Sequence, residues 1–335
     1  MSEFTYRGAG VDIDLERIAI EALLQKLTFR RSGTFAMLSE IGHYSGLIDF
    51  GEKVLALTTD GVGTKMLLAE RMQNYRTIGI DCIAMNVNDL YVMNLEPVAF
   101  VDYIACDSLS PEIMAQIGEG LNEGARQANV SIVGGETATL RGMVNGLDLA
   151  GAALGVQEKR KVVTGDRIAP GDLILGVPSS GIHSNGLTLA RRIAEAHGGY
   201  GQTLGGAHGG LTLGEELLKP TRIYREALRV CEKIPVHGMC HITGGGLLNF
   251  LRLSKYGFEI DEPLEPQFIF HWLQQAGNVS DGEMYRTFNM GMGFAFIVPG
   301  GYEDEVMQLV PDAKAVGKVV ERHGVWLQGM EVRWG

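Results

Sequence analysis

The chain has 335 residues and a net charge of −11. At about 150 residues per domain, this length predicts two domains, and 45% hydrophobic with 21% charged residues is the composition of a globular protein. The negative charge argues against binding to nucleic acid or to an anionic membrane, because both require a basic surface. No apolar stretch approaches the roughly 20 residues of a membrane span, and no signal peptide is visible at the start. The four cysteines include no C-x-x-C pair, which favours reduced thiols in the cytoplasm over disulfides or a zinc site.

The first half of the chain alternates between predicted strands and helices. Strands are predicted at 53–59, 98–105, 130–133 and 147–156, and helices at 13–26, 77–94 and 110–129. This alternation is typical of an α/β or α+β fold. A polar stretch with Gly-Asp and Pro-Gly turns follows at 159–171. We therefore expect one domain over residues 1–164 and a second over residues 165–335.

The second half repeats this style. Strands are predicted at 172–177, 293–298 and 313–320, and helices directly after Gly186, at 221–231, directly after Gly246 and at 302–309. No exact short-period repeat is visible, which argues against solenoids and propellers. Both halves are thus expected to be mixed α/β domains.

A glycine-containing hexapeptide, DGVGTK, follows the first predicted strand. It contains Asp60, Gly61, Gly63, Thr64 and Lys65. Glycines let the backbone approach a phosphate, and a lysine ammonium can neutralise one. The pattern is not a Walker A motif, and the alternative is a tight turn with a surface lysine.

Two acids lie within the very apolar helix predicted at 77–94. Asp81 and Asp89 are eight residues apart, which places them within roughly 80° of each other around the helix axis. Burying a carboxylate among apolar neighbours is costly unless it is paired or bound to a metal ion. We therefore assign a functional role to Asp89 ahead of Asp81; the alternative is that both acids face solvent.

Two further segments combine glycines with polar side chains. The sequence Gly-Gly-Glu-Thr at 134–137 ends a predicted strand, where it offers backbone N–H groups, a hydroxyl and a carboxylate suited to Mg²⁺. The sequence SSGIHSNG at 179–186 joins a predicted strand to a helix, a favoured place for ligands. His183 in this loop titrates near neutrality and can act as acid, base or phosphate donor. The alternatives are a plain turn and a capping loop with an incidental histidine.

The sequence HITGGG at 241–246 opens a predicted helix. Free backbone N–H groups and the helix dipole favour an anion there, and the alternative is again a turn. Several glycine-rich loops of the phosphate-binding type, together with acids, point to a nucleotide-using, metal-assisted enzyme. They do not name its substrate.

Taken together, these segments resemble the phosphoribosylformylglycinamidine cyclo-ligase (aminoimidazole ribonucleotide synthetase) family. The motifs that carry the resemblance occur in order as YRGAGVDID (6–14), TDGVGTK (59–65), IGIDCIAMNVNDL (78–90), EP (96–97), DY (102–103), GGETA (134–138), AG (150–151), SSGIHSNG (179–186), PTRIY (220–224), HITGGG (241–246) and EMYRTFNM (283–290). Only part of this set is shared with selenophosphate synthetase, thiamine-monophosphate kinase, the hydrogenase maturation protein HypE and formylglycinamidine ribonucleotide synthetase. The full set is therefore far more specific than any single motif.

The resemblance implies an N-terminal α/β domain whose strands complete a barrel across a homodimer, followed by a C-terminal α/β domain. It implies ATP- and Mg²⁺-dependent ring closure of formylglycinamidine ribonucleotide to 5-aminoimidazole ribonucleotide in de novo purine biosynthesis, with release of ADP and phosphate. An amide-type oxygen is a poor leaving group. Transfer of the γ-phosphoryl group to it prepares the carbon for attack by the neighbouring nitrogen, and the protein contributes positioning and charge stabilisation.

Carried over position by position, the resemblance implies that Asp60, Asp89 and Glu136 bind the metal ion. It also implies that Asp89, His183 and Asn185 lie at the reacting centre. The residues expected to contact ATP are Gly61, Gly63, Thr64, Lys65, Gly134, Gly135, Thr137, Thr243, Gly244 and Gly245. His241 occupies a place where some relatives carry a metal-binding Asp.

Two other classes of function compete with this one. A kinase-like or selenium-activating relative is disfavoured because no cysteine lies between residues 1 and 81, where selenophosphate synthetase commonly carries its reactive residue, and because the chain lacks the C-terminal cysteine of HypE. A non-catalytic nucleotide-binding subunit is disfavoured by the presence of Asp60, Asp89 and Glu136.

Overall fold

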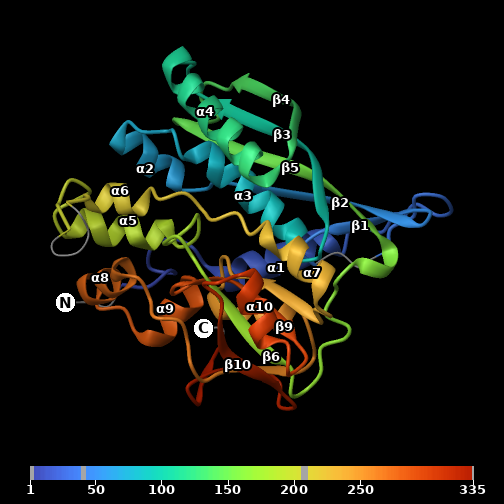
Figure 1. Ribbon diagram of the computed structural model, residues 1–335. Helices are drawn as coiled ribbons and strands as arrows, with labels where there is room; N and C mark the ends of the chain where they lie inside the picture. The colour runs from blue at the N-terminus through green and yellow to red at the C-terminus, as the bar shows by residue number, and fades with distance from the viewer. Residues whose placement is uncertain (1–3, 39–42, 205–209, 334–335) are drawn as a thin grey trace.

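The computed structural model describes residues 4–38, 43–204 and 210–333. The described strands form two sheets, one of five strands within residues 46–158 and one of seven strands within residues 173–332. Figure 1 shows the five-stranded sheet above and the seven-stranded sheet below, each with helices packed against it. The prediction of a mixed α/β fold is confirmed. Among the helices of the described ranges, none is both long enough and apolar enough to cross a bilayer.

The five-stranded sheet has the strand order β1-β2-β5-β3-β4. Its strands are β1 (Gly46–Phe50), β2 (Lys53–Gly61), β3 (Glu96–Cys106), β4 (Ser131–Thr139) and β5 (Leu147–Glu158). Only the β3–β4 pair is parallel among these neighbours. Side chains of β2 alternate between buried and exposed along most of the strand, because successive residues of a strand point to opposite faces. Helices cover one face, and on the other face described side chains such as Leu57, Val101 and Tyr103 are exposed.

Helices α2 (Lys65–Met72), α3 (Ile78–Tyr91) and α4 (Pro111–Ala128) belong to this half of the chain, and α3 packs directly on β2, β3 and β5. Almost every residue of α3 is buried, which agrees with its apolar sequence. Helix α4 begins at the predicted Ser-Pro pair, where the Ser110 hydroxyl accepts a hydrogen bond from the Ile113 N–H.

Helices α3 and α4 touch through glycine. A Cβ atom added to Gly79 would lie 2.1 Å from the backbone nitrogen of Leu121, and one added to Gly120 would lie 2.5 Å from the Arg76 carbonyl oxygen. Any larger residue would force the two helices apart, because the obstructing atoms are backbone. This contact fixes the close spacing between α3 and α4.

The seven-stranded sheet has the order β12-β11-β8-β10-β6-β9-β7. Its strands are β6 (Leu173–Pro178), β7 (Gly238–His241), β8 (Gly257–Ile260), β9 (Met292–Val298), β10 (Lys314–Val320), β11 (Gly324–Leu327) and β12 (Met330–Val332). The helices of this half are α5 (Leu187–Ala196), α6 (Leu213–Leu217), α7 (Glu226–Lys233), α8 (Phe268–Gly277), α9 (Asp281–Thr287), α10 (Glu303–Leu309) and the 3₁₀ helix η3 (Gly246–Arg252). A short 3₁₀ helix, η1 (Lys159–Lys161), precedes them. All seven residues of β9 are buried, as expected of an apolar strand inside a sheet.

The N-terminal segment crosses to the second half of the chain before α1 (Ile13–Leu24) begins. The Phe4 N–H donates to the Gly277 carbonyl at 3.1 Å, and the Tyr6 N–H donates to Glu283 Oε1 at 2.6 Å. Both halves of the chain therefore contribute to the structure around α8 and α9. The boundary expected between residues 164 and 165 stays a prediction.

Three predicted elements differ from the structure. The strand predicted at 130–133 continues to Thr139, because its parallel pairing with β3 continues through the Gly-Gly-Glu-Thr segment. The helix predicted at 221–231 begins only at Glu226. Residues 220–224 are not helical, and they form hydrogen bonds with Ser180 of the second half and with Asp81 and Asn88 of the first half. The helix expected after Gly246 is a 3₁₀ helix.

Candidate functional site

Two carboxylates come together where β2 ends and α3 makes its last turn. Burial, with the negative charge of Asp89 as the second cause, raises the pKa of Asp60 to about 6. The Gly61 N–H donates to Asp60 Oδ1 at 2.7 Å, and Asp89 keeps 22% of its side chain exposed. Two neighbouring carboxylates offer hard oxygen atoms to a cation. The structure thus brings Asp60 and Asp89 together.

Strand register decides which other acids can join this pair. Gly151 of β5 pairs with Asp60 of β2 on one side and with Asp102 of β3 on the other. Asp102 pairs in turn with Gly135 of β4. Directly paired residues share a face, so Asp102 points to the same helix-covered face as Asp60, whereas Glu136 points to the open face and is exposed. Three strand spacings, about 14 Å, separate β2 from β4. Within one chain Glu136 does not join the pair, and Asp102, which the sequence did not single out as a ligand, lies closer in register.

The other residues expected to bind phosphate from this segment follow the same geometry. Gly134, Gly135 and Thr137 lie in β4, which is the edge strand of the sheet and exposed along almost its whole length. They do not form the loop after a strand that the sequence suggests. A phosphate on these residues would lie apart from the Asp60–Asp89 pair of the same chain.

Lys65 lies in a different place from the one expected. Its ammonium is fully buried, donates to Asp81 Oδ1 at 2.9 Å and to the Lys219 carbonyl at 2.7 Å, and has no exposed surface. The Thr221 N–H and hydroxyl donate to the same Asp81 oxygen at 2.8 and 2.6 Å. Lys65 therefore neutralises Asp81 inside the protein and presents no charge to a ligand in this structure. This pairing also explains how α3 tolerates a buried Asp81.

The rest of the DGVGTK segment leads toward the second half of the chain. Gly63 has a φ of 67°, a backbone conformation that favours glycine. The Thr64 and Thr188 hydroxyls lie 3.0 Å apart, and Thr188 belongs to the first turn of α5. The segment that begins α2 therefore touches the start of α5, whose N-terminal N–H groups follow the SSGIHSNG loop.

His183 sits at the centre of that loop with almost no exposed surface. Its Nε2 accepts hydrogen bonds from the Ser180 N–H at 3.2 Å and, more weakly, from the Arg222 N–H at 3.5 Å. Its Nδ1 is buried and has no hydrogen-bond partner among the described residues. Burial lowers the pKa of His183 well below its usual value, and the nearby His241, Lys65 and Arg222 act in the same direction. The imidazole is therefore neutral, with a lone pair at Nε2 and its proton on Nδ1.

The HITGGG segment lies against the same loop. A Cβ atom added to Gly244 would lie 3.4 Å from Asn185 Oδ1, so the two segments are in contact. The buried Asn249 shapes the turn, because its Oδ1 accepts the Thr243 N–H at 2.7 Å and its Nδ2 donates to the Gly244 carbonyl at 3.1 Å. Gly245 has a φ of 95°. The structure thus brings Asn185, Thr243, Gly244 and Gly245 together.

A metal ion at this site would rely on few protein ligands. Across the residues that the structure describes, no group of three or more His, Cys, Asp or Glu is arranged to hold a metal ion. Mg²⁺ often takes only one or two carboxylates, with waters and substrate phosphates completing its octahedron. The donor set of Asp60 and Asp89 therefore fits Mg²⁺ bound together with a nucleotide.

Comparison with known protein families defines the class. Residues 42–157 match the family described as AIR synthase related protein, N-terminal domain, and residues 169–328 match the AIR synthase related protein, C-terminal domain. Together the two matches cover most of the chain. The chain therefore belongs to the AIR synthase related family.

Within this family the chain is similar to enzymes named phosphoribosylformylglycinamidine cyclo-ligase. It is 50% identical to that of Methanococcoides burtonii over 328 residues, which cover 98% of each chain. The protein of Methanosarcina acetivorans is 51% identical over 96% of this chain and 97% of its own, and that of Thermococcus kodakarensis is 47% identical over 98% and 99%.

Solved structures of more distant proteins share the fold. They include tt0281 from Thermus thermophilus, with a TM-score of 0.67 and 19% identity over 97% of this chain and 100% of that one. Thiamine-monophosphate kinase from Stenotrophomonas maltophilia gives a TM-score of 0.64 and 19% identity over 95% and 96%. HypE from E. coli gives 0.62 and 22% identity over 83% of each chain. At these identities the likeness concerns the two-domain fold alone.

Proposed function

We propose that this protein uses ATP to close formylglycinamidine ribonucleotide into 5-aminoimidazole ribonucleotide, in de novo purine biosynthesis. The observation that carries the proposal is identity of about half of all residues, over nearly the full chain, with enzymes named for this reaction. The γ-phosphoryl group is transferred to the formyl amide oxygen of the substrate, which leaves ADP. The neighbouring amidine nitrogen then attacks the activated carbon, a C–N bond forms, and the C–O bond breaks as phosphate departs.

The residues assembled at the site suit these steps. Within the glycine-lined turns, the backbone N–H groups at 63–64 and 244–245 are proposed to donate to phosphate oxygens. Asp89 and Asn185 supply a carboxylate and an amide beside those turns. Mg²⁺ held by Asp60 and Asp89 would supply charge neutralisation for the phosphoryl group when bound. Glu136, Gly134, Gly135 and Thr137 join the same ligand only if a second copy of the chain brings its β4 to the site.

His183 is proposed to act at the reacting centre as a hydrogen-bond donor. Because backbone N–H groups occupy its Nε2, its proton lies on Nδ1, and a neutral imidazole held in this way donates without first being charged. Nδ1 is buried in this structure, so the proposal requires the loop at 179–186 to open when substrate binds; a donor then aimed at the amide oxygen would stabilise the charge that develops as the phosphoryl group arrives. The proposal assigns His183 no role as a general base.

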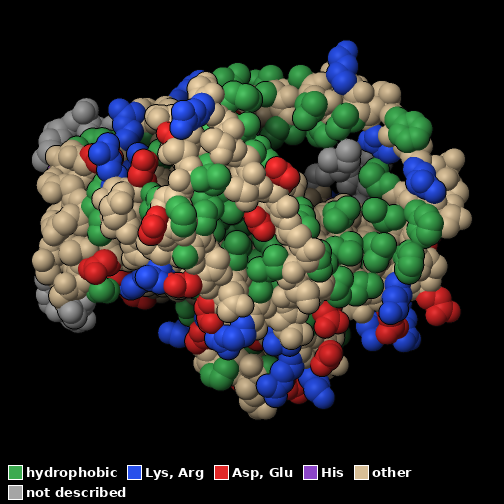
Figure 2. All heavy atoms as spheres, turned by 90° about the horizontal axis from the view of Figure 1, so that it is seen from above, with side chains coloured by type: hydrophobic (Ala, Val, Ile, Leu, Met, Phe, Trp, Pro, Cys, Tyr) green, Lys and Arg blue, Asp and Glu red, His purple; other side chains and the backbone are tan. Residues whose placement is uncertain are grey.

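A homodimer is proposed from the open face of the five-stranded sheet. Leu57, Val101 and Tyr103 point to this face and are 52%, 39% and 42% exposed. Viewed from above, hydrophobic side chains gather over part of the molecular surface in Figure 2. A broad apolar patch of this kind marks an interaction surface, and covering it with the same face of a second copy would close the two sheets into a barrel.

This interface is tested by sedimentation velocity of Val101→Glu. The expected result is a monomer, because a carboxylate within an apolar interface is costly to bury. Met143→Glu is the matched control, since Met143 is 82% exposed and lies in the loop between β4 and β5. A Val101→Glu protein that sediments as the wild type does would exclude this face.

The proposed setting is the cytoplasm. It is supported by Cys82, Cys106, Cys231 and Cys240, all of which are free thiols in the structure.

The enzymatic proposal is tested by coupling ADP release to a fluorescent or absorbance readout. The purified protein with ATP and Mg²⁺ is expected to release ADP only when formylglycinamidine ribonucleotide is added, and Asp89→Asn is expected to abolish the signal. Thiamine monophosphate serves as the competing substrate, because thiamine-monophosphate kinase shares the fold. ADP release with thiamine monophosphate and not with formylglycinamidine ribonucleotide would overturn the proposal.

A further inference from the structure

Asp89 is held by a side chain from the other half of the chain. His241 is the last residue of β7 in the seven-stranded sheet, and its side chain has no exposed surface. Its Nδ1 lies 2.7 Å from Asp89 Oδ1, across a sequence separation of 152 residues. One oxygen of the proposed metal ligand is thus already committed to an imidazole.

Asn88 determines which nitrogen of His241 carries the proton. The Tyr224 N–H donates to Asn88 Oδ1 at 3.0 Å, and Asn88 Nδ2 donates to the Arg222 carbonyl at 2.8 Å. A donor on one side and an acceptor on the other fix the orientation of the amide. The same Nδ2 faces His241 Nε2 at 3.5 Å. Because an amide NH₂ faces Nε2, that nitrogen presents its lone pair, and Nδ1–H donates to Asp89.

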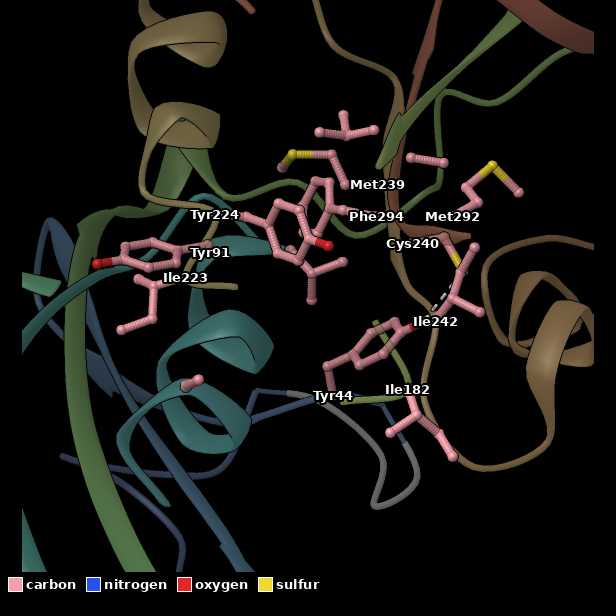
Figure 3. Packing of buried hydrophobic residues seen from close by; sticks show 14 of the residues in the cluster. Tyr44, Tyr91, Ile182, Ile223, Tyr224, Met239, Cys240, Ile242, Met292 and Phe294 are labelled. Atoms are coloured by element: carbon pink, nitrogen blue, oxygen red, sulfur yellow. Dashed lines mark hydrogen bonds between the residues drawn. The ribbon is translucent and has the colours of Figure 1, made fainter. Parts of the chain in front are cut away.

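Packing keeps the imidazole in this orientation. The rings of Tyr224 and His241 meet edge to face, with centroids 6.5 Å apart and an interplanar angle of 64°. Tyr224 in turn stacks on Phe294 at 5.0 Å, and its hydroxyl donates to the Pro178 carbonyl at 3.1 Å. Figure 3 shows Tyr224 and Phe294 lying together, with Tyr44 reaching toward Cys240 beside them. The Tyr44 hydroxyl donates to the His241 carbonyl at 3.3 Å, so the backbone of His241 is held as well.

We infer that His241 is a positioning residue, which holds the Asp89 carboxylate by Oδ1 so that Oδ2 is presented to Mg²⁺, and that Asn88 sets the tautomer this requires. The inference rests on the proposed Mg²⁺ site of Asp60 and Asp89. His241 itself is no ligand, because its Nε2 faces Asn88 inside the protein. An outer residue that orients a metal ligand in this way typically changes metal affinity by about 10- to 100-fold when it is removed.

The test titrates Mn²⁺ into ADP-saturated protein and follows free Mn²⁺ by electron paramagnetic resonance. We expect His241→Leu to weaken Mn²⁺ binding by about 10- to 100-fold. His241→Asn, whose short amide can donate from near the Nδ1 position, should keep most of the affinity. His241→Gln, whose longer amide reaches the Nε2 position, should behave as His241→Leu does. Unchanged affinity in His241→Leu, or equal losses in the Leu and Asn variants, would overturn the inference.

Unfolding temperatures of each variant in a metal chelator separate lost affinity from lost folding. If His241→Leu does not fold, the comparison of His241→Asn with His241→Gln still decides the question. The wild-type protein offers an independent reading, because ¹⁵N chemical shifts of labelled histidine report the tautomer directly. The expected state of His241 is protonation at Nδ1 alone, and a proton on Nε2 would contradict the role given to Asn88.

Asp89→Asn distinguishes failure of this inference from failure of the metal site. If Asp89→Asn binds Mn²⁺ as tightly as the wild type, Asp89 is no ligand and the proposed site itself is wrong. If Asp89→Asn loses affinity while His241→Leu keeps it, the metal site stands and only the positioning role of His241 falls.

Discussion

Replacing Lys65 by methionine should lower the stability of the folded protein rather than remove a contact with ATP. Lys65 and Asp81 form an ion pair in which neither side chain is exposed, with Nζ 2.8 Å from Oδ2. Methionine fills a similar volume without charge and leaves the Asp81 carboxylate buried with only the two donors of Thr221. Removing one partner of a buried pair costs about 3–5 kcal/mol. That loss is a large share of the roughly 5–15 kcal/mol by which folded proteins are stable.

The measurement is urea unfolding of the nucleotide-free protein, with the KM for ATP determined at a temperature where the variant is folded. Lys65→Met/Asp81→Asn should recover much of the lost stability, because the remaining buried group is then neutral. Lys159→Met is the surface control: its ion pair with Asp49 is 38% and 35% exposed, so little change is expected. A Lys65→Met protein of wild-type stability with a greatly raised KM for ATP would refute this reasoning and restore Lys65 as a phosphate contact.

Two further predictions follow from other contacts. In a metal chelator, the contribution of Asp60 to stability should fall as the pH rises from about 4 to about 6, because the pKa of Asp60 is raised on folding and its ionised form is disfavoured in the folded state. Asp60→Asn should remove this penalty, so its free energy of unfolding should exceed that of the wild type by about 1–3 kcal/mol at pH 8 but not at pH 4. Chemical unfolding at the two pH values is the measurement, and an equal difference at both would contradict the prediction. Gly79→Ala should lower the stability of the protein by about 1–3 kcal/mol or more through overpacking, because its Cβ atom would lie 2.1 Å from backbone. Gly118→Ala in α4 should stabilise the protein, because nothing lies within 4 Å of the added Cβ atom and alanine favours a helix over glycine. Thermal unfolding of both glycine variants is the check, and similar melting temperatures would show that the α3–α4 contact is not tight.

Long elements with a strong pattern could be predicted from the sequence. The apolar run of α3, the Ser-Pro start of α4 and the extended β3 and β5 are each long enough for local preferences to agree with the final fold. The short strands β7, β8, β11 and β12 were missed, because three or four residues carry no readable alternation. Helix α2 was also missed, since its first residue, Lys65, is the last residue of a motif interpreted as a loop.

The candidate site could be predicted as a set of residues but not as an arrangement. Glycines and acids mark Asp60, Asp89 and the HITGGG turn without any knowledge of the fold. The register of β4 places Glu136 on the opposite face from Asp60, and nothing local to either residue encodes that register. The environment of Lys65 likewise depends on Lys219, which is 154 residues away. Only a three-dimensional structure could show that this lysine points inward.

The hydrogen bonds from Thr221 to Asp81 have a consequence for folding during synthesis of the chain. At roughly 5–20 residues per second, the ribosome needs about 7–28 s to make the 140 residues that separate them. During that interval the Asp81 side chain, in the apolar helix α3, either stays exposed to water or is paired with Lys65 alone. The first half of the nascent chain therefore emerges with an unfinished interior. The burial of Asp81 is complete only after residues 220–224, which include Thr221, have been synthesised and have packed against α3.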